Sequence, residues 1–513
     1  MNSTLLKKFV SSTAWSFVSA VATKVSVVIT GILVARVLGA QSFGEYGLIQ
    51  SAIVMLANVA AQATTTATAK HIGQFKETCP EKTGRGIALT LLFSVVFSGM
   101  IIGTALFFPH FFSSVILGAD SLSAASLIVL STITLIILSG WTQGCLTGWG
   151  QYRTIATING IIAIVAIPAT YFLTLQLRLN GALLGLAGSQ LLIVFFSALA
   201  CWKTLKARNT TLSFKGAMTE KHAVLSVGLP VLLTGLMVAP MNWFANKLLA
   251  ETTNGLAALG MYAAAMQWNA IFSHVSVVLG SVLVPMLAAA LGGKSRKLDA
   301  LNFLSGWLVV LVIIQPVIMF PELLAKLYGS SFLGRDFEVT LVLVILGSLL
   351  SAFKSGISRK MIVMNLAWFS VMSNILWGVL FIAGALWLRE EGAIGIAKAF
   401  IGSQFIHFLL GLPYFVYKKI LPLELLVSPR ILILWTLPLI SFISSAYVES
   451  VLYRLMIMAL IFIYILATTF ALNAGRRQKL SATPDLSGRV LPCLITNSAL
   501  KNAPISRSVC CVA

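Results

Sequence analysis

Long apolar stretches follow one another along most of the chain, separated by short polar segments. Each stretch is long enough for a helix that crosses a bilayer, so the pattern predicts about fourteen spans at ~20 residues each. The expected spans are 13–35, 44–67, 86–108, 115–140, 154–175, 181–201, 223–246, 259–287, 300–320, 338–357, 361–387, 392–417, 430–448 and 451–473. The pattern therefore predicts an all-α polytopic membrane protein.

A short motif occurs twice in the chain, at an offset of 216 residues. Residues 39–46 read GAQSFGEY, and residues 255–262 read GLAALGMY, each in a turn between two apolar stretches. Six predicted helices separate the two turns, and an even number of crossings returns the chain to the same side. Both turns are therefore expected outside, in two parallel repeats related by a pseudo-twofold axis along the membrane normal.

The repeat predicts two pseudo-symmetric six-helix bundles with two further helices at the C-terminal end. The expected parts are an N-terminal bundle at 1–201, a cytoplasmic linker at 202–222, a second bundle at 223–420, two appended helices within 421–473, and a disordered basic tail at 474–513. The longest outer loop, roughly 321–337, is too short to hold a sizeable extracellular domain.

Composition and charge placement agree with a membrane protein. Hydrophobic residues make up 58% of the chain and charged residues 10%, whereas soluble domains carry roughly 25% charged residues. Most of the 36 Lys and Arg residues fall in inner loops and at the two ends; the outer loops hold Arg36, Arg178, Lys247, Lys326, Arg335, Arg389 and Arg454. This asymmetry places both termini in the cytoplasm. It also accounts for the net charge of +21 without a nucleic-acid partner.

The sequence lacks the usual signals of catalysis. It has no close pair of membrane-facing carboxylates, no metal-spaced His/Cys cluster, no phosphate-binding glycine loop and no nucleophile elbow. We therefore expect a transporter without a cofactor or metal rather than an enzyme. All six cysteines fall on the predicted cytoplasmic side, so no structural disulfide is expected.

Lys24 is the sharpest single signal for a binding site. It lies about eleven residues from either end of the first predicted helix, roughly 16 Å deep in the membrane. Only Lys24 and Lys398 are assigned to the interior of spans, and no acidic residue is expected at matching depth, because Glu45 and Asp120 lie at span edges. An intramembrane lysine costs roughly 2.5–3.5 kcal/mol to insert. An anion supplied by the substrate would offset that cost, although backbone carbonyls and hydroxyls in a packing role are the alternative.

Polar residues also recur on one predicted face of several helices. The helix at 44–67 carries Ser51, Asn58, Gln62 and Thr65, and the repeat offset pairs this face with Gln267, His274 and Ser281. The candidate substrate-binding residues are Lys24, Asn58, Gln62, Asn242, Asn246, Lys247, Gln267, His274 and Lys398. Neutral hydrogen-bonding groups suit sugar hydroxyls, but they equally suit contacts between helices. On the first helix, a hydroxyl stripe that includes Ser26 is expected to pack against a neighbour.

The segment ARVLGAQSFGEY at 35–46 closely resembles the opening of bacterial polysaccharide transporters, the O-antigen-unit flippases. These proteins belong to the multidrug/oligosaccharidyl-lipid/polysaccharide exporter superfamily. Residues 228–230 (GLP) and the second motif, followed by Ala263-Ala-Ala, resemble the same family in its second half. The resemblance covers roughly residues 5–420.

The resemblance implies two six-helix bundles around a central cavity in the bacterial inner membrane. It also implies a cargo of undecaprenyl-diphosphate-linked oligosaccharide, flipped from the cytoplasmic to the periplasmic leaflet by alternating access. Lys24 would then meet the diphosphate, and the polar faces would meet the glycan. Other polysaccharide assembly proteins are possible partners.

Two other functions remain open from the sequence. A cation-coupled multidrug exporter of the same superfamily would typically use membrane-embedded acids, whereas this chain carries lysines in its spans. A membrane-embedded glycan polymerase or ligase usually brings a large periplasmic loop with catalytic Arg or His, and no such loop is expected here. The sequence therefore supports transport of an anionic, lipid-linked cargo better than it supports either alternative function.

Overall fold

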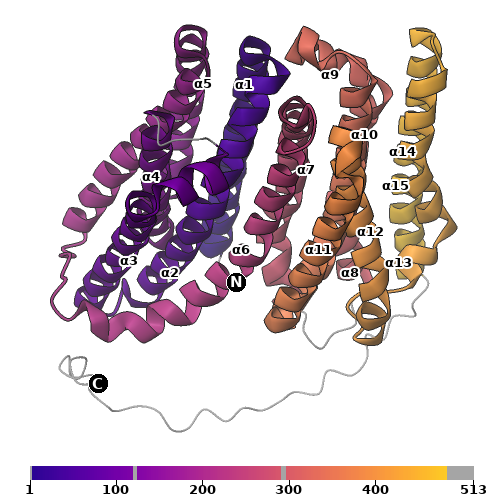
Figure 1. Ribbon diagram of the computed structural model, residues 1–513. Coiled ribbons are helices and arrows are strands. Elements are labelled where there is room, and N and C mark those ends of the chain that lie inside the picture. The colour runs from indigo at the N-terminus through magenta and orange to yellow at the C-terminus, as the bar shows by residue number, and fades with distance from the viewer. Residues whose placement is uncertain (1–2, 119–123, 290–295, 365, 482–513) are drawn as a thin grey trace, which may run out of the picture. The chain divides into compact units, whose positions relative to one another are not determined.

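The protein is described by a computed structural model that covers residues 3–118, 124–289, 296–364 and 366–481. The chain divides into two compact units, Met1–Met458 and Ala459–Ala513. All regular secondary structure in the described ranges is helical, which confirms the predicted all-α class. The helices of the first unit include most of the predicted spans (Figure 1).

The main helices follow the predicted apolar stretches in order. Their bounds are α1 (Ser3–Ile53), α2 (Val59–Phe75), α3 (Pro80–Phe107), α4 (Ala124–Gly148), α5 (Tyr152–Ala207), α6 (Lys221–Ala250), α7 (Gly255–Ala289), α8 (Arg296–Met319), α10 (Arg335–Val363), α11 (Ala367–Leu388), α12 (Gly392–Tyr417), α14 (Pro429–Tyr447) and α15 (Val451–Ser481). Two short helices, α9 (Pro321–Tyr328) and α13 (Glu424–Val427), lie between them.

Nine helical segments of the described residues are long and apolar enough to cross a membrane, or ten when the bent pair Ala217–Ser226 and Val231–Ala250 is counted as one. Three of these segments are 50, 53 and 56 residues long. Each of the three is long enough for two crossings at ~20 residues per crossing. The structure thus confirms a polytopic membrane protein, with the predicted fourteen spans as an approximate number.

Two of the longest helices contain a sharp break where a turn was predicted. In α1 the break is at Gly39, with φ 77° and ψ 171°, a conformation that a residue without Cβ adopts readily. In α5 it is at Arg178, with φ 51° and ψ −127°. The Arg178 guanidinium donates to the Val37 carbonyl at 3.1 Å, so the two breaks lie beside each other.

The two repeated motifs contact each other directly through their glycines. A Cβ built on Gly44 would lie 1.8 Å from the Leu256 carbonyl oxygen, and one built on Gly260 would lie 2.0 Å from that of Ala40. Ala40 and Leu256 are themselves related by the 216-residue offset. The contact is therefore reciprocal, as a pseudo-twofold axis requires. Figure 1 shows α1 alongside α7, and α1 also packs against α5.

Several boundaries differ from the sequence-based expectation. The span expected at 115–140 is instead a π-helix at Phe111–Leu117 followed, after Gly118 with φ 70°, by α4. The outer loop at 321–337 contains α9 rather than only irregular chain. The last helix continues to Ser481, beyond the expected end at 473. The remainder of the predicted tail, 482–513, lies outside the described residues.

Candidate functional site

Lys24 and His274 are two predicted site residues that lie on helices of different repeats. Lys24 lies in α1 and His274 in α7, both half-buried, and their side chains are close enough to interact electrostatically. Among the described residues, no acidic side chain forms an ion pair with Lys24. A lysine in a membrane-spanning helix without an acidic partner favours an anionic ligand over a cationic one.

Ser26 in α1 has the packing role expected for the hydroxyl stripe. Its side chain is buried, and its Oγ donates to the Ala163 carbonyl of α5 at 2.8 Å. Lys24 is two residues away, so its side chain points to a different side of α1. The division between a packing face toward α5 and a polar face toward α7 agrees with these contacts.

The polar face predicted on the second helix is interrupted by a π-helix. Val54–Asn58 is a π-helix between the end of α1 and the start of α2. The prediction that Ser51 and Asn58 share one face was wrong, because it assumed an unbroken α-helix and a π-turn shifts the angular register. Ser51 is half-buried and donates to the Leu48 carbonyl of its own helix at 2.7 Å, whereas Asn58 is exposed.

A different polar ridge on α2 begins at the π-helix. Asn58, Gln62, Thr66 and Lys70 follow at intervals of four residues, which places them on one helical face. Asn58, Gln62 and Lys70 are exposed, and Thr66 Oγ1 donates to the Gln62 carbonyl at 2.9 Å. Thr65 has turned to the neighbouring helix, where its hydroxyl donates to Gly140 of α4 at 2.8 Å. The ridge leads from the predicted residues Asn58 and Gln62 to a lysine that the sequence analysis did not single out.

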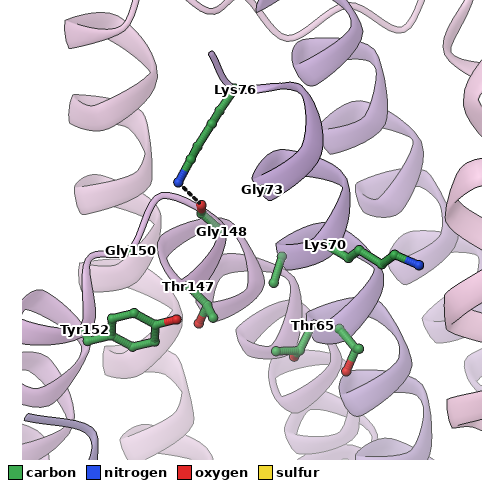
Figure 2. A pocket seen from close by; sticks show the side chains of 10 residues that line it. Thr65, Lys70, Gly73, Lys76, Thr147, Gly148, Gly150 and Tyr152 are labelled. Carbon is green, nitrogen blue, oxygen red and sulfur yellow. Dashed lines mark hydrogen bonds between the residues drawn. The ribbon is translucent and has the colours of Figure 1, made fainter. Parts of the chain in front are cut away.

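A pocket of about 540 Å³ lies where this ridge ends. Thr65, Thr66 and Lys70 of α2, with Lys76 just after that helix, line it on one side, and the end of α4 with Tyr152 of α5 lines the other. Figure 2 shows Lys76 reaching the Gly148 carbonyl at 3.1 Å, while Lys70 points to the other side of α2. Hydroxyls and two lysines are groups that bind phosphate oxygens. Continuation of the spacing of four beyond Gln62 would have found Lys70 from the sequence.

The other candidate residues are distributed over several environments. Gln267 is a packing residue here, since its side chain lies against Gly31 and accepts a hydrogen bond from the Tyr328 hydroxyl at 3.4 Å. Asn242 Nδ2 donates to the Val238 carbonyl of its own helix at 2.9 Å, and Asn246 is half-buried. In the described part of the chain, none of these three amides is hydrogen-bonded to Lys24. The side chain of Ser281 lies outside the described residues.

Two of the predicted cations are engaged near helix ends. Lys247 donates to the Val115 carbonyl at 2.6 Å, lies 3.8 Å from the Glu251 carboxylate, and covers the Trp243 ring at 5.6 Å from its centroid. Lys398 forms an ion pair with Glu391, and its side chain is 48% exposed. Both contacts place these lysines apart from the Lys24–His274 pair.

Lys354 of α10 is a further lysine within a helix, and the sequence analysis did not single it out. It lies inside the expected span at 338–357, although the charge assignment counts it among the inner residues. The helix continues to Val363, beyond the expected end at 357. Its ammonium contacts Gln404 and His407 of α12.

Close to Lys354, hydrogen bonds of Arg359 join α10 to α7 and α8, and we call this group the Arg359 clamp. Arg359, buried in α10, donates to the Asn302 side chain of α8 at 2.7 Å and to the Ser276 carbonyl of α7 at 3.0 Å. Among the described residues, no group of three or more His, Cys, Asp or Glu side chains could hold a metal ion. Cys79, Cys145 and Cys201 are free thiols, and the other three cysteines lie outside the described residues.

Residues 9–291 match the family described as polysaccharide biosynthesis protein, which is more than half of the chain. The chain belongs to this family. The match covers the whole first repeat together with α6 and α7, and hence both glycine-tyrosine motifs, Lys24 and His274.

Two relatives of this family member are polysaccharide export proteins. The protein is 29% identical over 117 residues to the EPS I polysaccharide export inner membrane protein EpsE of Ralstonia nicotianae, which is 22% of this chain and 26% of the relative. It is 32% identical over 94 residues to the EpsE protein of Ralstonia solanacearum, which is 17% of this chain and 20% of the relative. The chain thus aligns with about a quarter or less of each relative's length.

Solved structures show that the fold is shared with two kinds of transporter. The lipid II flippase MurJ in an inward closed conformation superposes with a TM-score of 0.69 over 90% of this chain and 99% of its own, at 15% identity. An inward-facing multidrug resistance MATE family transporter of the MOP superfamily gives 0.57 over 77% and 95%, at 18% identity. At these identities the likeness concerns the fold alone, and it confirms the MOP-type architecture.

Proposed function

We propose that the protein flips undecaprenyl-diphosphate-linked oligosaccharide repeat units, of O-antigen or a related surface polysaccharide, from the cytoplasmic to the periplasmic leaflet of the bacterial inner membrane. Membership of the polysaccharide biosynthesis family and similarity to export proteins support the cargo class. The protein is then a transporter with both termini in the cytoplasm.

The observation that carries the proposal is the Lys24–His274 pair in helices of both repeats. A lipid diphosphate brings the anion that no acidic residue supplies to Lys24 among the described residues. The exposed amides Asn58 and Gln62 then offer donors and acceptors to sugar hydroxyls. The MATE-like fold alone would also suit a cationic drug, but the charge of Lys24 opposes a cation.

Alternating access follows from the contact between the two motifs. Backbone contact through Gly44 and Gly260 closes the chain on the predicted outer side. Movement of one repeat relative to the other about this contact would open that side and expose the polar groups on α1, α2 and α7 to the opposite leaflet. We propose that this movement carries the lipid-linked glycan across.

The test is deletion of the gene followed by extraction of lipid-linked intermediates. We expect single repeat units on undecaprenyl diphosphate to accumulate, with the glycan accessible to a glycosidase only after the inner membrane is permeabilised. Long polymer on the lipid would instead indicate a missing ligase, and single lipid-linked units accessible without permeabilisation of the inner membrane would indicate a missing polymerase. Uptake of a cationic dye by vesicles that contain the purified protein, unaffected by loss of Lys24, would contradict the proposal in favour of drug export.

A further inference from the structure

Lys354 and three other polar side chains form a cluster at the junction of three helices. The Nζ of Lys354 donates to Gln404 Oε1 at 2.6 Å and contacts His407 Nδ1 at 2.7 Å, both on α12. The opposite ring nitrogen of His407, Nε2, contacts Ser373 Oγ of α11 at 2.7 Å. An ammonium can only donate, so His407 Nδ1 is the acceptor when Lys354 is charged, and Nε2 carries the ring hydrogen. The four groups form one continuous hydrogen-bonded chain.

This chain begins inside α10, a helix long and apolar enough to span a membrane, rather than at the end of that helix. Lys354 is about nine residues before the end of α10, or roughly 14 Å along the helix axis. His407 is buried, while Lys354 keeps some exposed surface. A charged lysine in this position is costly to insert in a membrane, and an apolar residue of the same length would avoid that cost.

The acidic groups around the cluster are engaged elsewhere, and none forms an ion pair with Lys354 or His407 in the described part of the chain. On the helices that contact α10, the charged and titratable groups are His274 on α7, Asp299 on α8 paired with Lys360, Glu322 on α9 paired with Arg454, Lys326 on α9, and Lys398 on α12 paired with Glu391. On α10 itself they are Arg335, Asp336, Glu338 and Arg359. Helix α8 also carries Arg296 and Lys297, whose side chains lie outside the described residues. Helix α11 carries no charged residue.

Lys354 and His407 together can hold one proton but not two. At 2.7 Å between Nζ and Nδ1, protonation of both groups would place two cations in contact without an acid between them. When Lys354 releases its proton to water, the amine becomes neutral and still donates to Gln404, and His407 remains neutral with its hydrogen toward Ser373. The two states differ by one unit of charge at the junction of α10, α11 and α12.

We propose that Lys354 and His407 form a single-proton site that takes up and releases one proton in each transport cycle. The ligand of this site is a proton, and the site couples movement of the cargo to the proton gradient. This inference rests on the proposed transport function, but it uses residues distinct from the Lys24–His274 pair. Gln404 and Ser373 are positioning residues that hold the two nitrogen atoms in contact.

Direct titration of the site tests the proposal without any cargo. The protein contains five histidines, so NMR spectra of the full-length protein with ¹³C-labelled histidine rings resolve a small set of signals, and His407→Gln assigns one of them. We expect the His407 signal to shift with pH as Lys354 titrates, and to lose that shift in Lys354→Met. A His407 signal with the same pH dependence in Lys354→Met as in the parent would overturn the site.

Proton movement in vesicles tests the coupling. Vesicles loaded with a pH-sensitive dye receive undecaprenyl-diphosphate-linked oligosaccharide extracted from polysaccharide-producing cells, and internal pH is followed. Lys354→Met is never charged, and Lys354→Arg retains its proton at all relevant pH values. Both variants should lose cargo-dependent proton movement, while Lys418→Met, an exposed lysine just after α12, keeps it.

The two Lys354 variants distinguish a lysine that binds and releases a proton from one that only needs to be charged. Normal proton movement in Lys354→Arg would show that only the charge is needed and would contradict proton release. Size-exclusion profiles and protein levels establish that each variant folds. If the parent protein flips no lipid-linked glycan, the proposed function fails, whereas the NMR titration still decides whether Lys354 and His407 share a titrating proton.

Discussion

Two lysines within helices of this protein have different surroundings and therefore suit different ligands. Lys24 in α1 and Lys354 in α10 are both cations without an acidic ion-pair partner among the described residues, but their surroundings differ. Lys24 lies within electrostatic range of His274, and an external anion would supply the partner that no acidic residue provides. Lys354 is already held by Gln404 and His407, which suits a small ligand such as a proton. The neighbours therefore assign different tasks to the same residue type.

Replacement of Lys24 should test the role of its charge. A hydrogen bond to a charged group contributes roughly 1.5–3 kcal/mol, so Lys24→Ala should lower the rate of flipping about tenfold or more, because the diphosphate loses its cation. Lys24→Arg should retain part of the activity. The measurement is surface polysaccharide in a deletion strain that carries each variant at equal protein level.

The control for this series is Lys203→Ala, which removes an exposed lysine near the end of α5. It should support surface polysaccharide at the parental level. Equal activity of Lys24→Ala and the parent would remove Lys24 from the binding site and leave it as a packing residue.

Arg359 should contribute to stability rather than to transport. Its guanidinium joins α10 to α7 and α8 through Ser276 and Asn302, so Arg359→Met leaves buried polar groups without a partner. We expect a loss of about 1–3 kcal/mol in stability, seen as a lower melting temperature in detergent. Arg389→Met, whose side chain is 42% exposed beside Glu390, is the matched control and should melt with the parent. An unchanged melting temperature for Arg359→Met would show that the clamp is dispensable.

At the scale of helices, the breaks and close approaches decide what moves. Gly39 and Arg178 break α1 and α5 at adjacent positions, and the π-helix at Val54–Asn58 shifts the register between α1 and α2. The glycine contact between α1 and α7 is made by backbone atoms, so a side chain there cannot be accommodated by rotation alone. In the proposed alternating-access cycle, α1 and α7 are therefore the helices that would separate on the predicted outer side.

Gly44→Ala should favour the conformation in which the predicted outer side is open. The added Cβ would lie 1.8 Å from the Leu256 carbonyl oxygen, which forces α1 and α7 apart. Tyr262→Cys, at a position only 2% exposed in the closed arrangement, reports the opening. We expect labelling by a membrane-impermeant maleimide, applied to intact cells, to rise several-fold when Gly44→Ala is added.

The reciprocal variant Gly260→Ala should raise the labelling in the same way, since its Cβ would lie 2.0 Å from the Ala40 carbonyl oxygen. Gly99→Ala in α3 adds a methyl group where nothing lies within 4 Å and serves as control. If labelling in Gly44→Ala matched that in Gly99→Ala, closure through the glycine motifs would be excluded.

At the scale of the whole molecule, the distribution of charge predicts the orientation in the membrane. Lysine and arginine residues gather in the loops assigned to the cytoplasm, including the linker at 202–222. The two glycine-tyrosine motifs and the segment with α9 then face the periplasm. In this orientation the pocket lined by Lys70 and Lys76 lies toward the cytoplasmic side, because Lys76 is in a loop assigned to the cytoplasm.

Single cysteines in a cysteine-free background test this orientation. Ser331→Cys, after α9, should react with an impermeant maleimide added to intact cells, because it is exposed on the predicted outer side. Lys215→Cys, in the linker, should react only after the inner membrane is permeabilised. The opposite pattern would invert the topology and with it the proposed direction of transport.

The order of apolar stretches and the repeated motif determined the fold class, because the bilayer imposes a length on each helix and a duplicated sequence folds twice in the same way. The same reasoning found Lys24 and His274, since an intramembrane charge is conspicuous in any sequence. Only the tertiary structure showed that the two motifs touch through Gly44 and Gly260. It also moved Ser51 off the polar face and placed Lys354 against His407. Helix register and contacts between distant segments depend on packing, and a local pattern of residues does not specify that packing.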